Sequence, residues 1–439
     1  MILTIIIAGL TALSMIGAVL FKPYINIGKF KVGLYWIICL IGAVAMLLTN
    51  CIDLSSAIDG ITANTSVNPL KILALFLSMT LLSVYLGDAG FFDYIADTVF
   101  LKSKGGQLKL FLILYAVVSV LTIFTSNDVI ILTFTPPICI FAKKAKISPL
   151  PYLFGEFVAA NTWSMMLIVG NPTNVYLAGS FGITFTEYLS VMWLPAIVGG
   201  ITGLCIILLL FRKQLLLPVS GRLQKELERS PVHKVKISRV PMIIAIVHLL
   251  ICIILLAVAD LIAVEMWLIC LVLALSLTAF DLAYDLIVMH SATPVWRSLK
   301  KEPYELIPFV LSMFIIVLAL KENGVTDALT NLLSSGTKTD GISFTFLSAL
   351  SANLLNNIPM SVLFERIASG ANLPAVYGSI IGSNVGAFIT PVGALAGIMW
   401  NKILAKYDVK MPFYKFVLYG AAVAIPTLVT SAAALLIVL

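Results

Sequence analysis

Long runs of apolar residues recur along the whole chain and are separated by short polar segments. A run of about 20 apolar residues crosses the roughly 30 Å hydrocarbon layer of a membrane as a helix. None of the runs alternates with the period of two that a membrane β-barrel would show. The pattern predicts an all-α polytopic membrane protein with ten transmembrane helices, at 1–21, 32–49, 69–89, 151–176, 190–211, 241–259, 262–280, 303–322, 374–400 and 412–438.

Two further apolar segments, 107–142 and 342–368, are too long for one crossing and too short for two. Each has a polar cluster at its centre, "TSNDV" around Asn127 and "NLLNNIP" around Asn356. We expect each segment to form a re-entrant helical hairpin that enters and leaves the membrane on the same side.

The basic residues predict the orientation. The chain has 439 residues, of which 60% are hydrophobic and 11% charged, with a net charge of +7. If the N-terminus is outside, every Lys and Arg except Lys71, Lys321, Lys338 and Arg366 falls in a loop on the inner side. The positive-inside rule therefore predicts a multi-pass protein of the plasma (inner) membrane, with both termini outside and a cytoplasmic loop at 212–240. The net positive charge reflects these loops, so it does not indicate nucleic-acid binding.

The two halves of the chain resemble each other. Residues 72–95 match 306–329, with Ser78 and Gly90 corresponding to Ser312 and Gly324, each 234 residues later. Further on, "SNDV" aligns with "NNIP" and "AANTWSMMLIVG" aligns with "GSNVGAFITPVG". We predict a first repeat at 1–211, a linker at 212–240 and a second repeat at 241–439. Because five crossings are an odd number, the second repeat would be inverted, as in many secondary transporters.

Glycine and proline interrupt equivalent crossings of the two repeats. Unwound backbone at membrane depth is tolerated only where it is buried in protein or lines a wet cavity. Glycine can instead serve close helix packing, which is our interpretation of Gly199 and Gly200. The predicted helix breaks are Gly170 and Pro172 in 151–176, and Gly382, Gly386, Pro391 and Gly393 in 374–400. The predicted solute-binding residues are Ser126, Asn127, Asn161, Asn171, Thr173, Asn356, Asn357, Asn384 and Thr390.

Ionisable residues inside the membrane are costly and are therefore functional candidates. Asp128 lies at the first hairpin tip, whereas its counterpart Asn357 is neutral, so Asp128 suits coupling to protons or sodium. A helix-capping role for Asp128 is the alternative. Glu156 is a second coupling candidate, with a solvated position at the membrane surface as its alternative.

The three histidines and six cysteines show no ligand spacing, so neither a metal site nor another cofactor is expected. The chain also contains no G-x-x-x-x-G-K-[ST] loop, so pumping by ATP would need a separate soluble ATPase subunit. A homodimer is compatible with the sequence. An intramembrane enzyme would need a nucleophile–base pair or metal ligands, which the predicted crossings do not offer. A passive channel is disfavoured, because hairpins that meet from opposite faces would close a path.

The stretches "NNIP" and "GSNVGAFITPVGALAGIMW" resemble the arsenite efflux permeases of the ion transporter superfamily. Asn127 and Asp128 match the Asn-Asp pair of the family's first hairpin. Ala394 departs from the family's serine, and "GNPTN" at 170–174 is closer to the sodium/proton antiporter and dicarboxylate branches. The later motif is matched by Thr390, Pro391, Gly393, Leu395, Ala396 and Trp400.

The resemblance implies a secondary-active transporter that exports arsenite or antimonite by alternating access, coupled to proton entry. A sodium/proton antiporter and a cation-coupled carboxylate transporter are the alternatives. The hairpin tips lack the Ser-Asn-Thr triplets of the dicarboxylate carriers, which argues against the last of these.

Overall fold

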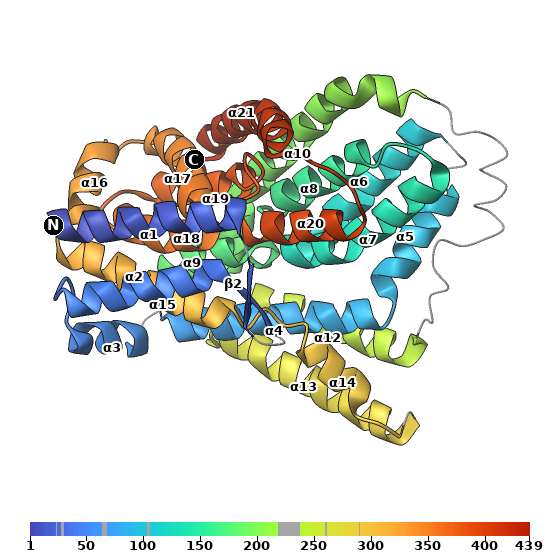
Figure 1. The fold of residues 1–439 in the computed structure, drawn as a ribbon, viewed down its shortest axis with the longest axis horizontal. Helices are drawn as coiled ribbons and strands as arrows, with labels where there is room; N and C mark the ends of the chain where they lie inside the picture. Colours follow the sequence, from blue (N-terminus) through green and yellow to red (C-terminus); the bar gives the residue numbers. More distant parts are fainter. Residues whose placement is uncertain are drawn as a thin grey trace.

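The computed structural model describes residues 1–22, 24–27, 30–63, 68–102, 106–217, 238–259, 261–288 and 290–439, and they are almost entirely helical. Several helices, among them α1 (Ile2–Phe21), α4 (Pro69–Asp88) and α20 (Leu395–Lys406), run along the long axis of the molecule (Figure 1). By length and composition, six helices of the described chain can each cross a membrane. They are α4, α6 (Gln107–Phe124), α10 (Phe185–Leu215), α12 (Arg239–Ala257), α13 (Met266–Val288) and α21 (Phe413–Val438). The chain is therefore a multi-pass helical membrane protein.

The other predicted crossings also correspond to helices, and some of these are short or bent. The first two are α1 and α2 (Leu34–Leu48). The eighth is α15 (Leu306–Glu322), which meets α16 (Val325–Leu333) at an angle of 76°. Short helices α3 (Leu54–Thr62), α5 (Phe91–Lys102) and α14 (Thr293–Leu299) connect the longer ones. The total of ten crossings stays a prediction.

Each predicted hairpin consists of two helices that meet at the expected polar tip. The first is α6 followed by α7 (Asn127–Ala145), and the second is α17 (Asp340–Leu355) followed by α18 (Asn357–Ala368). Because α6 alone is long enough to span a membrane, the return of each pair to its own side stays a prediction.

The order of the helices repeats along the chain. The series α4 to α10 is matched by α15 to α21, and α5 and α16 both follow a glycine with positive φ, +88° at Gly90 and +71° at Gly324. Helix α8 (Leu150–Trp163) and α9 (Pro172–Ser180) flank the first break, and α19 (Leu373–Gly386) and α20 flank the second. Both edges of the break shift by 223 residues, from Trp163 to Gly386 and from Pro172 to Leu395. The internal similarity in the sequence is thus matched by a repeated series of elements.

The connection between α1 and α2 differs from expectation. The sequence predicts a loop at 22–31, but β1 (Tyr24–Ile27) and β2 (Phe30–Gly33) pair as an antiparallel ribbon. Glu305 holds the end of the ribbon, because it accepts hydrogen bonds from the Gly33 backbone N–H (3.1 Å) and the Tyr35 hydroxyl (3.2 Å). Most of the predicted 212–240 loop lies outside the described residues, which resume at 238.

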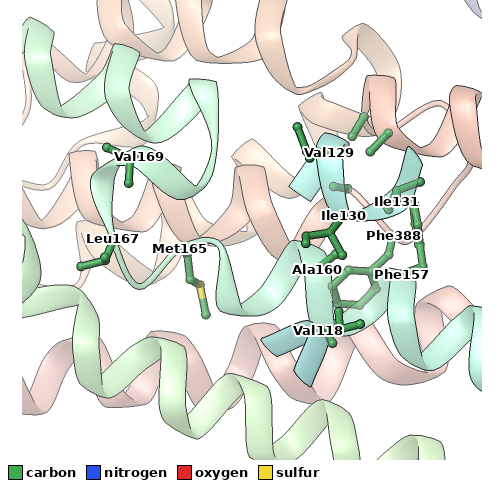
Figure 2. Close-up of a cluster of buried hydrophobic side chains, with 14 of the residues drawn as sticks. Val118, Val129, Ile130, Ile131, Phe157, Ala160, Met165, Leu167, Val169 and Phe388 are labelled. Carbon is green, nitrogen blue, oxygen red and sulfur yellow. The ribbon is translucent and has the colours of Figure 1, made fainter. Parts of the chain in front are cut away.

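Buried apolar side chains form a large core around α7, α8 and α19, and a smaller one among α1, α2, α4 and α15. Figure 2 shows Val129 and Ile130 of α7 beside Ala160 and Phe157 of α8, with Phe388 of the second break next to them. Helices α10 and α21 pack on each other, and a Cβ on Gly199 would collide with the Ser431 hydroxyl. This contact confirms that Gly199 serves helix packing. The core thus holds both breaks inside protein.

Candidate functional site

The first break covers residues 164–171 and includes a short 3₁₀ turn, η1 (Ile168–Gly170). Glycine is required at position 170, because a Cβ there would collide with the backbone carbonyl of Ser164. Asn171 then caps α9 by accepting a hydrogen bond from the Thr173 N–H (3.2 Å), and Pro172 fills the first helical position. The predicted break at Gly170 and Pro172 is therefore in place.

The second break covers residues 387–394 and contains Pro391 and Gly393, as predicted. The prediction was wrong for Gly382, which lies inside α19, and Gly386 is the last helical residue. A Cβ on Gly382 would collide with the Ser348 side chain and the Thr345 carbonyl of α17. Gly382 therefore serves close helix packing, which produces the same sequence signal as a break.

Asn384, near the end of α19, joins the two broken helices. Its Oδ1 accepts hydrogen bonds from Ser164 Oγ (2.9 Å) and Asn171 Nδ2 (2.9 Å), and its Nδ2 donates to Asn174 Oδ1 (2.6 Å). Beside it, the Ser383 hydroxyl donates to the Thr173 hydroxyl (2.7 Å). Each of these side chains is at most 1% exposed. The two halves of the chain therefore meet through neutral amides and hydroxyls.

The tip of the first helix pair extends this network. Asn127 Nδ2 donates to Asn161 Oδ1 (3.0 Å), and the Ser164 hydroxyl donates to the Asn161 carbonyl (2.9 Å) as well as contacting Asn384. Of the residues predicted from the sequence, Asn127, Asn161, Asn171, Thr173 and Asn384 thus share one network, hereafter the polar centre. Sequence reasoning missed three further members: Ser164, Asn174 and Ser383. Asn174 closes the "GNPTN" stretch and could have been included on that signal.

The tip of the second helix pair forms a separate cluster. Asn356, with a strained φ of +78°, donates to the Val392 carbonyl (3.0 Å), and the Thr390 N–H donates to Asn353 Oδ1 (2.9 Å). Asn353 also reaches the end of α19 by donating to the Gly386 carbonyl (2.8 Å). This cluster therefore abuts the polar centre through α19, but no hydrogen bond between described residues joins the two directly.

Two predicted site residues have buried polar atoms without a hydrogen-bond partner among the described residues: Ser126 Oγ and Asn357 Oδ1. Such atoms are uncommon in native structures and often mark a place where water or a ligand binds. A small apolar pocket lies between α9 and α18 and is lined by Thr173, Ile358 and Ser361. The helix that begins at Asn357 is therefore next to Thr173 of the polar centre.

Asp128 and Glu156 are both buried, at 7% and 1% exposure. Asp128 lies in the first turn of α7, which packs on α20. Glu156 accepts hydrogen bonds of 2.9 and 3.1 Å from the Thr135 hydroxyl, so the solvated alternative for it is wrong.

Wherever burial is described, no Lys or Arg side chain is fully buried. The site can therefore hold a neutral polar solute or a cation, but it offers an anion no permanent positive charge.

Comparison with known proteins identifies the family of the chain. Residues 30–376 match the protein family described as CitMHS, citrate transporter. The chain is 25% identical over 375 residues to the arsenical pump membrane protein of Escherichia coli, covering 82% of this chain and 85% of that protein. It is 23% identical over 419 residues to an uncharacterised transporter of Synechocystis, covering 89% and 90%.

Among solved structures, the YdaH transporter of Alcanivorax borkumensis shares the fold. The TM-score is 0.54 at 13% sequence identity, and the alignment covers 99% of this chain and 97% of that chain. The family match extends over most of the sequence and the shared fold over nearly all of it. The chain is a membrane transporter of the ion transporter superfamily and belongs to the citrate transporter (CitMHS) family.

Proposed function

We propose that the protein is a secondary transporter that exports arsenite or antimonite in exchange for protons. The observation that carries this proposal is the polar centre itself, which is built from neutral amides and hydroxyls of both broken helices, without a fully buried Lys or Arg. The relatives named as arsenical pump membrane proteins support the same cargo.

Arsenite at neutral pH is a small uncharged molecule with three hydroxyl groups, each able to donate and accept hydrogen bonds. Asparagine side chains offer two donors and an acceptor each, so a few of them can satisfy such a solute without a charged group. Ser126 Oγ and Asn357 Oδ1, at the tips of the two helix pairs, have no hydrogen-bond partner in the described part of the chain and would bond the solute. The solute would replace some of the present hydrogen bonds between Asn127, Asn161 and Asn384.

Asp128 is the proposed coupling residue. A buried carboxylate is stable only when it is protonated or paired with a cation, so its proton must be exchanged when the site opens to either side. Glu156 is a second candidate for this role, although the Thr135 hydroxyl already satisfies it.

The proposed movement rests on inverted repeats at 1–211 and 241–439. Two halves of opposite orientation can exchange conformations, which opens a site between them first to one side and then to the other. In this arrangement both termini are outside and the 212–240 linker is cytoplasmic. Neither a homodimer nor a soluble ATPase subunit is needed for it, although both remain compatible with the chain.

Transport of citrate or another carboxylate together with a cation is the second candidate, because the family description names citrate. Since the polar centre lacks buried basic residues, a citrate anion would need cotransported cations for charge balance. Sodium/proton exchange is a third candidate that uses Asp128 alone.

Flux measurements on the purified protein in lipid vesicles separate these functions. An imposed pH gradient should drive accumulation of arsenite and antimonite, whereas citrate and sodium should stay near the level of empty vesicles. Accumulation of citrate or sodium without arsenite movement would overturn the proposed cargo.

A further inference from the structure

A group of three sulfur atoms lies where α4, α12 and α13 pack together. The thiol of Cys252 in α12 is 3.8 Å from the thiol of Cys270 in α13 and 3.8 Å from the thioether of Met79 in α4. Both cysteines are fully buried and Met79 is 4% exposed. Figure 1 shows α12 and α13 along the edge of the molecule, away from α8, α19 and α20. This sulfur cluster is therefore not part of the polar centre.

The spacing of the two thiols suits two bonds to one central atom. Two sulfurs bonded at about 2.3 Å, with a bond angle of roughly 100–110°, lie ~3.5–3.8 Å apart. The observed separation of 3.8 Å therefore needs almost no movement of α12 against α13. A disulfide would need a much larger approach, because its sulfurs are only about 2.05 Å apart.

The burial of the cluster favours a ligand whose adduct with the two sulfurs is neutral. Two thiolates around a monovalent soft metal would leave a net negative charge in an apolar setting, which is costly. Trivalent arsenic avoids this cost. Two thiols replace two hydroxyl groups of As(OH)₃, two As–S bonds form while two As–O bonds break, and two water molecules leave with the thiol protons. Arsenic keeps its oxidation state, and the adduct, (RS)₂As–OH, is neutral.

We propose that Cys252 and Cys270 form a dithiol site that captures trivalent arsenic or antimony, separate from the transport path. Met79 packs on the Cys252 thiol, which also contacts the Cys270 thiol. The inference shares its substrate class with the proposed function, but it concerns binding and not flux.

The test uses the purified full-length chain, sodium arsenite and intact-protein mass spectrometry after desalting. Wild type should retain about one arsenic per chain, because soft thiolates hold it tightly. An excess of dithiothreitol should remove this arsenic. Cys252→Ser and Cys270→Ser should each lose it. Cys39→Ser is the matched control, since Cys39 is also buried and also packs on a thioether, Met15 (3.7 Å), but is not part of the dithiol.

X-ray absorption at the arsenic edge gives a second readout on wild type alone. The proposal predicts two sulfur neighbours and one oxygen neighbour around the bound arsenic. It is overturned if wild type retains no arsenic, if three oxygen neighbours are found, or if both serine variants retain arsenic like wild type. Vesicle transport of arsenite is measured separately, so loss of either proposal leaves the other standing.

Discussion

At the scale of single residues, Asn384 has the largest share in the polar centre. Its side chain bonds Ser164, Asn171 and Asn174, and its Nδ2 also donates to the Ile380 carbonyl (2.8 Å). The sequence identifies Asn384 through its repeat partner Asn161. It does not identify the partners of Asn384, because they lie more than 200 residues away and depend on how two helix ends meet.

Replacing Asn384 with alanine should leave several buried polar groups unpaired. Each such group costs roughly 1–3 kcal/mol, so we expect a clear drop in thermal stability in detergent and loss of arsenite flux. Asn323→Ala is the control. Asn323 follows the end of α15, is only half-buried, and donates a hydrogen bond to the Cys51 carbonyl. Wild-type stability and flux in Asn384→Ala would show that the polar centre carries neither role.

Asp128 shows a second limit of sequence reasoning at this scale. Its burial and its position at a helix start follow from the "TSNDV" motif, and both are observed. The packing of its helix, α7, on α20 could not be anticipated, because these two helices lie far apart in the sequence.

At the scale of helices, the breaks are the features that the sequence locates best. Glycine, proline and asparagine mark both breaks within a few residues, since each lowers the stability of a helix. Their extent is less predictable. Gly382 and Pro391 give the same signal, but only the neighbouring helix α17 shows that the first is a packing contact.

Gly382→Ala should force α17 and α19 apart. The added methyl group meets backbone and side-chain atoms of α17, so we expect a loss of about 1–3 kcal/mol in stability. Gly9→Ala is the matched control in a helix, because no atom lies within 4 Å of its added methyl, and it should be neutral or stabilising. Equal melting temperatures for the two variants would contradict the packing account.

At the scale of the whole molecule, α4 is tied at both ends to elements of the second half. Lys71 near its start pairs with Glu265 (2.7 Å), and Asp88 at its end pairs with Lys301. The terminal amine of Met1 donates to Asn323 (3.2 Å), which follows α15. The predicted orientation assigns Lys71, Glu265 and Met1 to the outside, and Asp88 and Lys301 to the inside. Each of the two ion pairs therefore joins residues that the charge pattern predicts on the same side of the membrane.

Labelling with a membrane-impermeant maleimide tests this orientation. Glu265→Cys should react in intact cells, whereas Lys301→Cys should react only after permeabilisation, and both positions are exposed enough for labelling. Wild type is the control for its native cysteines. The reverse pattern for the two variants would invert the predicted topology and would place the 212–240 linker outside.

The most direct test of the whole account is simultaneous measurement of arsenite and proton flux in vesicles, for wild type and Asp128→Asn. Glu302→Gln serves as the control, because it removes another buried carboxylate beyond the polar centre. In wild type and the control, the pH gradient should drive arsenite accumulation while protons move the opposite way. In Asp128→Asn, gradient-driven accumulation should fall about tenfold or more, while downhill arsenite movement persists. Wild-type accumulation and proton movement in Asp128→Asn would contradict the account.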